Sequence, residues 1–341
     1  MSLPQWRPGA RGVFAPPDAL PRRGIGYLRL SVTRGCSMRC TYCRPDFDRG
    51  HEPAAFDADD FGFLARHLHR RFGLRKVRIT GGEPTTRRDL PQIVSTLRGV
   101  GVSDLAMTTN ALTLKRDAAT LRRAGLRRLN VSLDSLDPRR FAELTGVDGL
   151  ARVLSGIDAA RSAGFASIKL NTVVVAGQNE EDLPDLLGYA ADWGVPIRFI
   201  ELMPMGPLAD AWERRYVPAA RMRSAMAGVV ARWVPDVARV EAASATDAAR
   251  MWTAELRDGR SARVGFITPM SEHFCDTCDR LRVTANGDVY PCLMDAPRGN
   301  LRDAVQGRDG VGIDAALRAA YAQKQPVHPP TAPGIMTHLG G

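Results

Sequence analysis

The chain has 341 residues, and its 47 Lys and Arg against 37 Asp and Glu give a formal net charge of +10. Hydrophobic residues make up 44% of it and charged residues 25%, which is typical of a soluble globular protein with one large domain or one domain plus a smaller one. The sequence lacks both an apolar stretch long enough to cross a bilayer and a basic stripe interleaved with aromatic residues, which argues against a membrane protein and against nucleic-acid binding.

Residues 1–24 are rich in Pro, Gly and Arg and contain no apolar core segment. We therefore interpret them as a flexible leader rather than a signal peptide, and a cytoplasmic location is the expectation. Cytosolic thiols are kept reduced, so closely spaced cysteines in such a protein are more often metal ligands than disulfides.

Residues 25–207 alternate between short β-rich runs and helical patterns. The predicted strands cover 27–32, 75–79, 104–108, 128–133, 167–174 and 196–200. The predicted helices cover 59–72, 89–100, 114–124, 138–145, 150–163 and 181–193. Such alternation implies parallel strands joined by right-handed crossovers. Six repeats predict an α/β fold, a partial (βα)6 TIM-like barrel, in which ligands gather at the C-terminal ends of the strands.

The pattern changes in residues 208–325, which we expect to form a smaller C-terminal α+β extension that closes over the barrel. A helix is predicted over 209–231, and strands over 253–256, 263–266, 281–284 and 289–292. Asn286-Gly287 between the last two strands is a strong hairpin signal. Residues 326–341 are a tail rich in Pro and Gly that ends in Gly340-Gly341.

The six cysteines form two triplets, Cys36-x3-Cys40-x2-Cys43 and Cys275-x2-Cys278-x13-Cys292. Three thiolates leave one iron of a [4Fe–4S] cluster open, and an open iron can bind a substrate or cofactor directly. The two spacings therefore predict two [4Fe–4S] clusters in a redox enzyme. The alternatives are a zinc site, which normally takes four ligands, and sets of buried thiols.

The first triplet lies on the loop after the first predicted strand, and it resembles the signature of the radical S-adenosylmethionine (SAM) superfamily. The resemblance implies that SAM chelates the open iron and is cleaved to a 5′-deoxyadenosyl radical. Tyr42, just before the third cysteine, matches the aromatic residue that this superfamily places against adenine. Gly81-Gly82-Glu83-Pro84 follows the second strand and resembles the motif that holds the SAM amino group, so Gly82 and Glu83 are assigned to the cofactor. The two glycines allow a close approach of backbone.

Three further residues match positions that contact SAM in this superfamily. They are Thr109 and Ser132, at the ends of the third and fourth strands, and Met203, after the sixth. Without the resemblance, Thr109 and Ser132 would be interpreted as turn or cap residues, and Met203 as a core methionine.

The second triplet, with Arg280-Leu281-Arg282 and the terminal Gly-Gly, resembles the GTP 3′,8-cyclase family of molybdenum cofactor biosynthesis. The similarity runs from about residue 27 to 341 and includes 169–175, 198–206 and 275–282. In that family the open iron of the second cluster binds the purine of GTP, and the Gly-Gly tail enters the active site. The resemblance implies catalytic roles for Arg280, Arg282, Gly340 and Gly341. The alternative for the tail is a loose chain end.

The resemblance also assigns a set of side chains to the GTP substrate. Arginine suits such a site because it binds phosphate oxygens in pairs. A charged side chain in an apolar strand faces either solvent or a barrel lumen, and the matching positions favour the lumen. The substrate set is Arg29, Lys76, Arg78, Thr109, Lys169, Arg198, Arg280 and Arg282.

The chain departs from the family pattern at a few positions without losing a cluster ligand. Asp279 stands where the family usually has Asn, and an acid there could alter purine contact or cluster charge. Ala111 follows Asn110 where Gly is usual. The dipeptides 85–86 and 34–35, near the two SAM motifs, also differ from the usual residues.

The resemblance implies conversion of GTP to (8S)-3′,8-cyclo-7,8-dihydroguanosine 5′-triphosphate. It also implies a reductant such as flavodoxin or ferredoxin and a downstream cyclic pyranopterin monophosphate synthase, and a homodimer is an open alternative to a monomer. One competing hypothesis is another two-cluster radical SAM enzyme that acts on a peptide or a different small molecule. The other is a non-catalytic zinc or iron–sulfur module.

Overall fold

The computed structural model describes residues 25–43, 54–236, 248–325 and 327–329. The predicted leader, 1–24, and the Gly-Gly end of the tail lie outside these residues. Within the described ranges, no helix is both long enough and apolar enough to span a bilayer.

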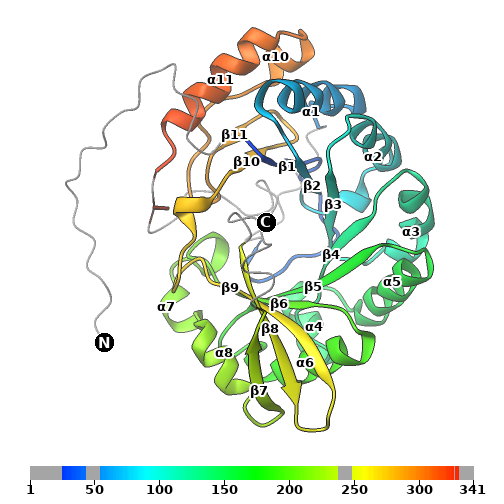
Figure 1. Cartoon of the computed structure of the whole chain (residues 1–341), viewed down its shortest axis with the longest axis vertical. Helices are drawn as coiled ribbons and strands as arrows, with labels where there is room; N and C mark the ends of the chain where they lie inside the picture. The colour runs from blue at the N-terminus through cyan, green and yellow to red at the C-terminus, as the bar shows by residue number, and fades with distance from the viewer. Residues whose placement is uncertain (1–24, 44–53, 237–247, 326, 330–341) are drawn as a thin grey trace, which may run out of the picture.

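The described strands form one eleven-stranded sheet in the order β11-β10-β1-β2-β3-β4-β5-β6-β9-β8-β7. Neighbours from β1 to β6 pair in parallel, which confirms the predicted partial barrel. The sheet curves round a central axis with its helices outside (Figure 1). The first six strands are β1 (Tyr27–Ser31), β2 (Lys76–Thr80), β3 (Asp104–Thr109), β4 (Arg128–Ser132), β5 (Ser167–Val174) and β6 (Ile197–Glu201).

The helices between these strands follow the predicted order and end at local signals. Asp57 caps the first of them through a capping box with Asp60, and Gly73 closes it in the left-handed region with a φ of 69°. The helices are α1 (Ala58–Phe72), α2 (Leu90–Gly99), α3 (Leu114–Arg123), α4 (Pro138–Thr145), α5 (Leu150–Ser162) and α6 (Leu183–Trp193).

The C-terminal segment lengthens the barrel sheet at both of its edges. On one side, β9 (Ser261–Ile267) pairs in parallel with β6, and β8 (Ala249–Leu256) and β7 (Val230–Pro235) follow in antiparallel order. On the other side, β10 (Arg280–Val283) pairs in parallel with β1, and β11 (Val289–Tyr290) with β10 in antiparallel order. The α+β character of this segment is as expected. The proposed boundary at residue 207 stays a prediction, because the sheet is continuous across it.

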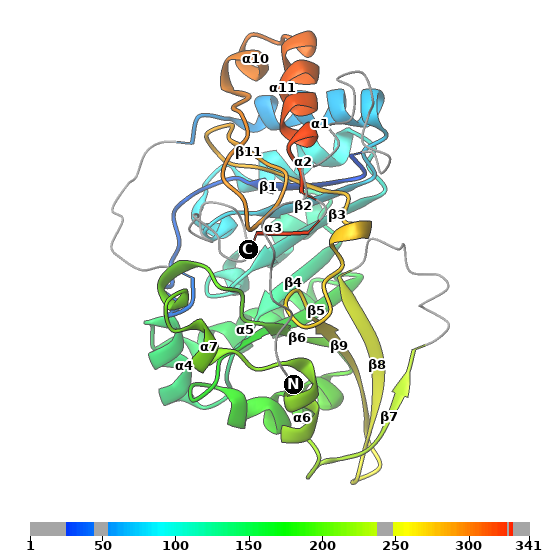
Figure 2. The ribbon, with the colours of Figure 1, turned by 90° about the vertical axis from the view of Figure 1, so that its left-hand side faces the viewer.

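Two helices complete the end of the molecule next to β10. They are α10 (Arg302–Gln306) and α11 (Gly310–Ala322), and both lie beside α1 in Figures 1 and 2. Asp314 on α11 accepts hydrogen bonds from His67 at 2.7 Å and Arg71 at 2.9 Å on α1. These contacts fix α11 against the first βα unit, with its C-terminal end directed toward the second cysteine triplet.

The prediction of one helix over 209–231 is wrong. The segment contains two short helices, α7 (Trp212–Arg215) and α8 (Ala219–Ala225), and then enters β7. Pro218 separates the two helices, since proline removes a backbone donor and clashes with the preceding turn. The strand predicted over 289–292 is also shorter, because β11 ends before Pro291.

The strands of the barrel place polar side chains on the inner face and apolar ones under the helices. In β1, Leu28 and Leu30 are fully buried in the core, while Tyr27 and Arg29 take the opposite face. The same alternation places Lys76 and Arg78 of β2, Arg280 and Arg282 of β10, and their counterparts on β5 and β6 toward the barrel axis. The barrel therefore encloses a cationic lumen.

Candidate active site

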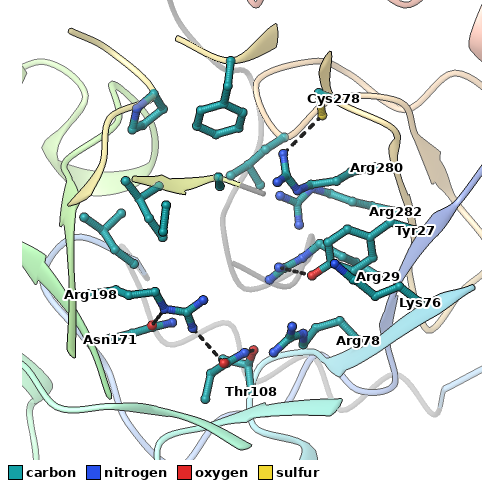
Figure 3. Close-up of a pocket in the computed structure, with 18 of the residues that line it drawn as sticks. Tyr27, Arg29, Lys76, Arg78, Thr108, Asn171, Arg198, Cys278, Arg280 and Arg282 are labelled. Atoms are coloured by element: carbon teal, nitrogen blue, oxygen red, sulfur yellow. Dashed lines mark hydrogen bonds between the residues drawn. The ribbon is translucent and has the colours of Figure 1, made fainter. Parts of the chain in front are cut away.

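A cavity of about 500 Å³ occupies the barrel lumen. Every basic side chain predicted to bind substrate lines it, which supports the lumen over the solvent for these positions. Figure 3 shows the side chains from β1, β2, β6 and β10 directed into one space. The basic lining residues of the predicted set are Arg29, Lys76, Arg78, Lys169, Arg198, Arg280 and Arg282.

The two cysteine triplets lie at opposite ends of the strands. Tyr27 at the start of β1 is paired with Arg280 at the start of β10, and the two strands are parallel. The first triplet follows the C-terminal end of β1, whereas Cys278 immediately precedes β10 and so lies at the other end. Cys292 follows β11, which runs back toward the same end as Cys278. All three cysteines of the second triplet line the cavity.

The first triplet has the donor set that an iron–sulfur cluster requires. None of its three cysteines forms a disulfide, and all three are half-buried. Burial is the largest of the influences that raise the pKa of Cys40, and the charges of Asp134, Cys43 and Cys36 raise it further. The amide of Asn110 donates to Cys36 Sγ at 3.9 Å. Thiolates that repel one another in this way fit a cationic inorganic core between them.

The second triplet has cations close to its sulfurs. Burial raises the pKa of Cys278, but the charges of Arg280 and Lys324 and the hydrogen bonds from Arg280 outweigh it, so that the pKa of this thiol is lowered overall. Arg280 Nη1 lies 3.5 Å and Lys324 Nζ 3.8 Å from its sulfur. The thiolate, which is the form that binds metal, is therefore favoured at Cys278, whereas burial raises the pKa of Cys275 and Cys292. In the described residues, no three His, Cys, Asp or Glu side chains are arranged to hold a single metal ion.

The two glycines of the Gly81-Gly82-Glu83-Pro84 motif let β2 dock onto the first cysteine loop. A Cβ on Gly82 would lie 2.2 Å from the carbonyl oxygen of Gly35, and one on Gly81 would lie 2.6 Å from that of Thr33. Gly82 N donates to Thr33 O at 2.7 Å, and Glu83 N donates to Gly35 O at 2.7 Å. Glycine is therefore required here by contact between two backbones within the protein.

The carboxylate of Glu83 is almost fully buried and joins the ends of β2 and β3. Its Oε1 accepts from the hydroxyls of Thr85 and Thr109, each at 2.7 Å, and its Oε2 accepts from Asn110 N at 2.6 Å. Burial raises the pKa of Glu83, and these hydrogen bonds oppose the shift. Thr109 thus faces Glu83, and Thr108 rather than Thr109 lines the cavity among the described residues. The SAM and substrate roles of Glu83 and Thr109 stay predictions.

Tyr42 links the first triplet to the end of β4. Its hydroxyl donates to Asp134 Oδ2 at 2.7 Å, and Asp134 Oδ1 accepts from Val173 N at 2.9 Å. Burial raises the pKa of Asp134 to about 6, against the effect of these two hydrogen bonds. Met203 lines the cavity, while Ser132, the last residue of β4, lies outside its lining in the described chain.

The cations of the lumen are closely spaced and partly screened from water. Burial and the charge of Arg29 lower the pKa of Arg282 to about 9, which leaves it charged at neutral pH. Arg198 donates to Asn171 Oδ1 at 2.8 Å and to Asn130 Oδ1 at 2.7 Å, so its guanidinium is held in place by two neighbouring strands (Figure 3). Neither asparagine belongs to the predicted site, although each follows the inward alternation of its strand.

Tyr27 is another lining residue outside the predicted set. Arg29 Nη1 donates to its hydroxyl at 3.4 Å, and Lys76 Nζ lies 5.2 Å from the centre of its ring. Burial raises the pKa of Tyr27, but the charges of Arg78, Arg29 and Arg280 outweigh it and lower the pKa to about 7. Its position two residues before Arg29 on β1 was the signal for a lumen residue.

The structure shows the surroundings of two positions that depart from the family pattern, Asp279 and Ala111. Asp279 does not face the cavity in the described structure, because β10 directs Arg280 inward and its neighbours outward. The side chain of Asp279 packs on Gly26, whose Cβ would lie 2.7 Å from its Oδ2, beside Arg75. Ala111 has a φ of 60°, a conformation in which glycine is unstrained, and this explains why glycine is usual there. An effect of this acid on purine contact or cluster charge stays a prediction.

Comparison with known proteins gives two matching family models and many relatives. The radical SAM superfamily model matches residues 30–190, and the Molybdenum Cofactor Synthesis C model matches residues 195–330. The chain is 39% identical over 313 residues to a GTP 3′,8-cyclase of Pelotomaculum thermopropionicum, which covers 90% of this chain and 93% of that protein. A GTP 3′,8-cyclase of Listeria monocytogenes is 38% identical over 309 residues, with 89% of each chain covered.

Solved structures show a similar fold at low sequence identity. Streptococcus suis SuiB bound to S-adenosylmethionine superimposes with a TM-score of 0.58 at 17% identity, over 82% of this chain and 64% of that one. The structure of anSMEcpe with bound AdoMet gives a TM-score of 0.55 at 12% identity, over 87% of this chain and 81% of that one.

Proposed function

The chain belongs to the GTP 3′,8-cyclase family of the radical SAM superfamily, and from this membership we propose that its lumen is the site where GTP is converted to (8S)-3′,8-cyclo-7,8-dihydroguanosine 5′-triphosphate in molybdenum cofactor biosynthesis. The observation that carries the proposal is the convergence of the predicted basic side chains and the second cysteine triplet on one cavity. A purine can thus reach the cysteines while its triphosphate meets the cations.

The cations of the lumen provide the charge that a triphosphate requires. Fixed guanidinium groups in a partly dry cavity bind phosphate oxygens more strongly than groups in water do, and they need no reorganisation when substrate arrives. Arg198 is already oriented by Asn171 and Asn130. The proposed substrate residues are Arg29, Lys76, Arg78, Thr109, Lys169, Arg198, Arg280 and Arg282.

The first triplet fits a [4Fe–4S] cluster, and the residues around it are the proposed SAM contacts. A cluster and SAM held there would supply radical chemistry directed at the ribose of GTP. The protein positions these groups and excludes water from the lumen. The proposed ligands are Cys36, Cys40 and Cys43, and the proposed SAM contacts are Tyr42, Gly82, Glu83, Ser132 and Met203.

The second triplet fits another cluster, because its thiols face the cavity and nearby cations favour the thiolate form of Cys278. Cys275, Cys278 and Cys292 would hold it with one iron directed at the purine. Arg280 and Arg282 are proposed to act in catalysis beside it. The same role is proposed for Gly340 and Gly341, which lie outside the described residues.

The proposal extends to partners. One electron must enter before SAM is cleaved, and a flavodoxin or ferredoxin in the cytoplasm would supply it. A cyclic pyranopterin monophosphate synthase would consume the product. A homodimer remains part of the proposal without a specific contact to support it.

An anaerobic turnover assay tests the function. Reconstituted protein is mixed with SAM, GTP and dithionite, and mass spectrometry follows the products. We expect 5′-deoxyadenosine together with a cyclised product that keeps the triphosphate. Formation of 5′-deoxyadenosine with unchanged GTP would contradict the proposed substrate and favour a peptide or another small molecule instead.

A further inference from the structure

The end of α11 contacts the backbone of the second cysteine triplet. Lys324 Nζ donates to the carbonyl oxygen of Cys278 at 2.9 Å and to that of Arg280 at 3.2 Å, and it lies 3.8 Å from Cys278 Sγ. Tyr321, three residues earlier, donates to the carbonyl oxygen of Asp279 at 3.4 Å. One side chain in the last turn of α11 and one two residues beyond its end therefore hold three consecutive carbonyl groups.

This contact lies on a part of β10 that its neighbouring strand does not cover. The short strand β11 pairs only with Arg282 and Val283, so the segment that joins Cys278 to Arg280 has no strand partner on that side within the described sheet. The ammonium group of Lys324 has three donors, and the two carbonyl groups and the sulfur match them in number. Helix α11 is itself fixed to α1 through Asp314, so its end is a rigid support.

The choice of lysine is informative in this chain. Among its 47 basic residues, lysine occurs only at positions 76, 115, 169 and 324. Two of these line the cavity and one contacts the second triplet, while Lys115 is exposed on α3. A chain that otherwise uses arginine keeps a compact point charge at Cys278, where a planar guanidinium could not meet two carbonyl oxygens and a sulfur at once.

We propose that Lys324 is a positioning residue for the second cysteine triplet, which holds Cys278 and Arg280 in place and stabilises the reduced state of the cluster bound there. This role rests on the proposed second cluster. A reduced cluster carries one more negative charge than the oxidised one, and a nearby ammonium favours it. Removal of the charge therefore lowers the midpoint potential.

The experiment measures cluster binding at the second triplet alone, in the full-length chain. Cys36, Cys40 and Cys43 are replaced by Ala, the protein is reconstituted anaerobically with iron and sulfide, and the iron content and midpoint potential are measured. Lys324→Met keeps the length of the side chain without its charge, and Lys324→Arg keeps the charge without the tetrahedral donors. Lys115→Met is the matched control for the loss of one lysine elsewhere.

We expect Lys324→Met to shift the midpoint potential to a more negative value, while Lys115→Met stays near the parent. Lys324→Arg should keep the parent potential, because it keeps the charge, but bind less iron, because a guanidinium cannot meet both carbonyl oxygens and the sulfur. Loss of iron from Lys324→Met, with or without a shift in potential, would equally support the holding role. A parent potential in Lys324→Met with full iron content would overturn the proposal and leave the cyclase function intact. Failure of the parent itself to bind iron would overturn the second cluster and this role together, and the turnover assay then tests the cyclase function separately.

Discussion

Tyr27 shows how a single residue takes its properties from the lumen. Its phenol lies on the inner face of β1, and the cations around it are Arg29 on its own strand, Arg78 and Lys76 on β2, and Arg280 on β10. These charges lower its pKa to about 7 from an ordinary value of 10.0. Without substrate and above about pH 7, its phenolate would offset part of the repulsion between the guanidinium groups.

The lowered pKa of Tyr27 predicts a pH-dependent stability without substrate. The unfolded chain binds the phenolic proton up to about pH 10 and the folded chain only up to about pH 7, so the free energy of unfolding rises with pH across this window. The contribution is lost as the pH falls through 7. We expect denaturant unfolding to show a gain of a few kcal/mol between pH 7 and 9 that Tyr27→Phe lacks. Parallel pH profiles for the two proteins would contradict this prediction, because all other titrating groups are shared.

Among the structural elements, the loop after β2 depends most on close backbone contact. Gly82 lies directly against the carbonyl group of Gly35, which belongs to the loop that carries the first cysteine triplet. Next to this contact, Glu83 joins β2 to β3 through Thr109 and the backbone of Asn110, and the side chain of Asn110 donates to Cys36 Sγ. A motif that the sequence assigns to the cofactor therefore also has a structural role.

Gly82→Ala tests this structural role without any cofactor. The new methyl group would meet backbone atoms at 2.2 Å, and backbone cannot move aside as a flexible side chain can. We expect a loss of about 2–3 kcal/mol in the free energy of unfolding, measured with urea, and a lower iron content at the first triplet. Gly99→Ala at the end of α2 is the control, because no atom lies within 4 Å of its added Cβ and the change should be neutral or stabilising. Equal stability of the two variants would refute the contact as the reason for Gly82.

At the scale of the whole molecule, the alternation of strands and helices was predictable from the sequence. The strands that pair at the two edges of the barrel sheet were not. The alternation of β1 to β6 with helices follows from local periodicity and caps, which the sequence carries. The pairing of β10 with β1 joins segments about 250 residues apart, and no local pattern encodes such a partner. The prediction of one helix over 209–231 was wrong because Pro218 interrupts the segment.

The candidate site was predictable only in part for the same reason. The cysteine spacings and the arginines at matching positions identified the lumen side chains. The orientation of Asp279 away from the cavity and the contact of Lys324 with Cys278 depend on how β10 meets β1 and on where α11 ends. Both features depend on tertiary structure, and neither residue belongs to a sequence motif that would predict them.

The separation of the two triplets predicts that their chemistry can be uncoupled. The first triplet lies beyond the C-terminal end of β1 and the second before the start of the parallel strand β10. Loss of the second should therefore leave the first intact. We expect the combined variant Cys275→Ala, Cys278→Ala and Cys292→Ala to form 5′-deoxyadenosine from SAM under reducing conditions, at a rate that GTP does not change, and to form no cyclised product.

Cys40→Ala is the control for this prediction, because it should abolish both products. Both compounds are quantified by mass spectrometry after anaerobic reconstitution, together with the iron content of each protein. If the second-triplet variant kept its iron at the first triplet and still left SAM intact, the two ends of the lumen would act as one unit. Uncoupled cleavage would instead show that radical generation at the first triplet does not require the second triplet, which lies at the other end of the strands.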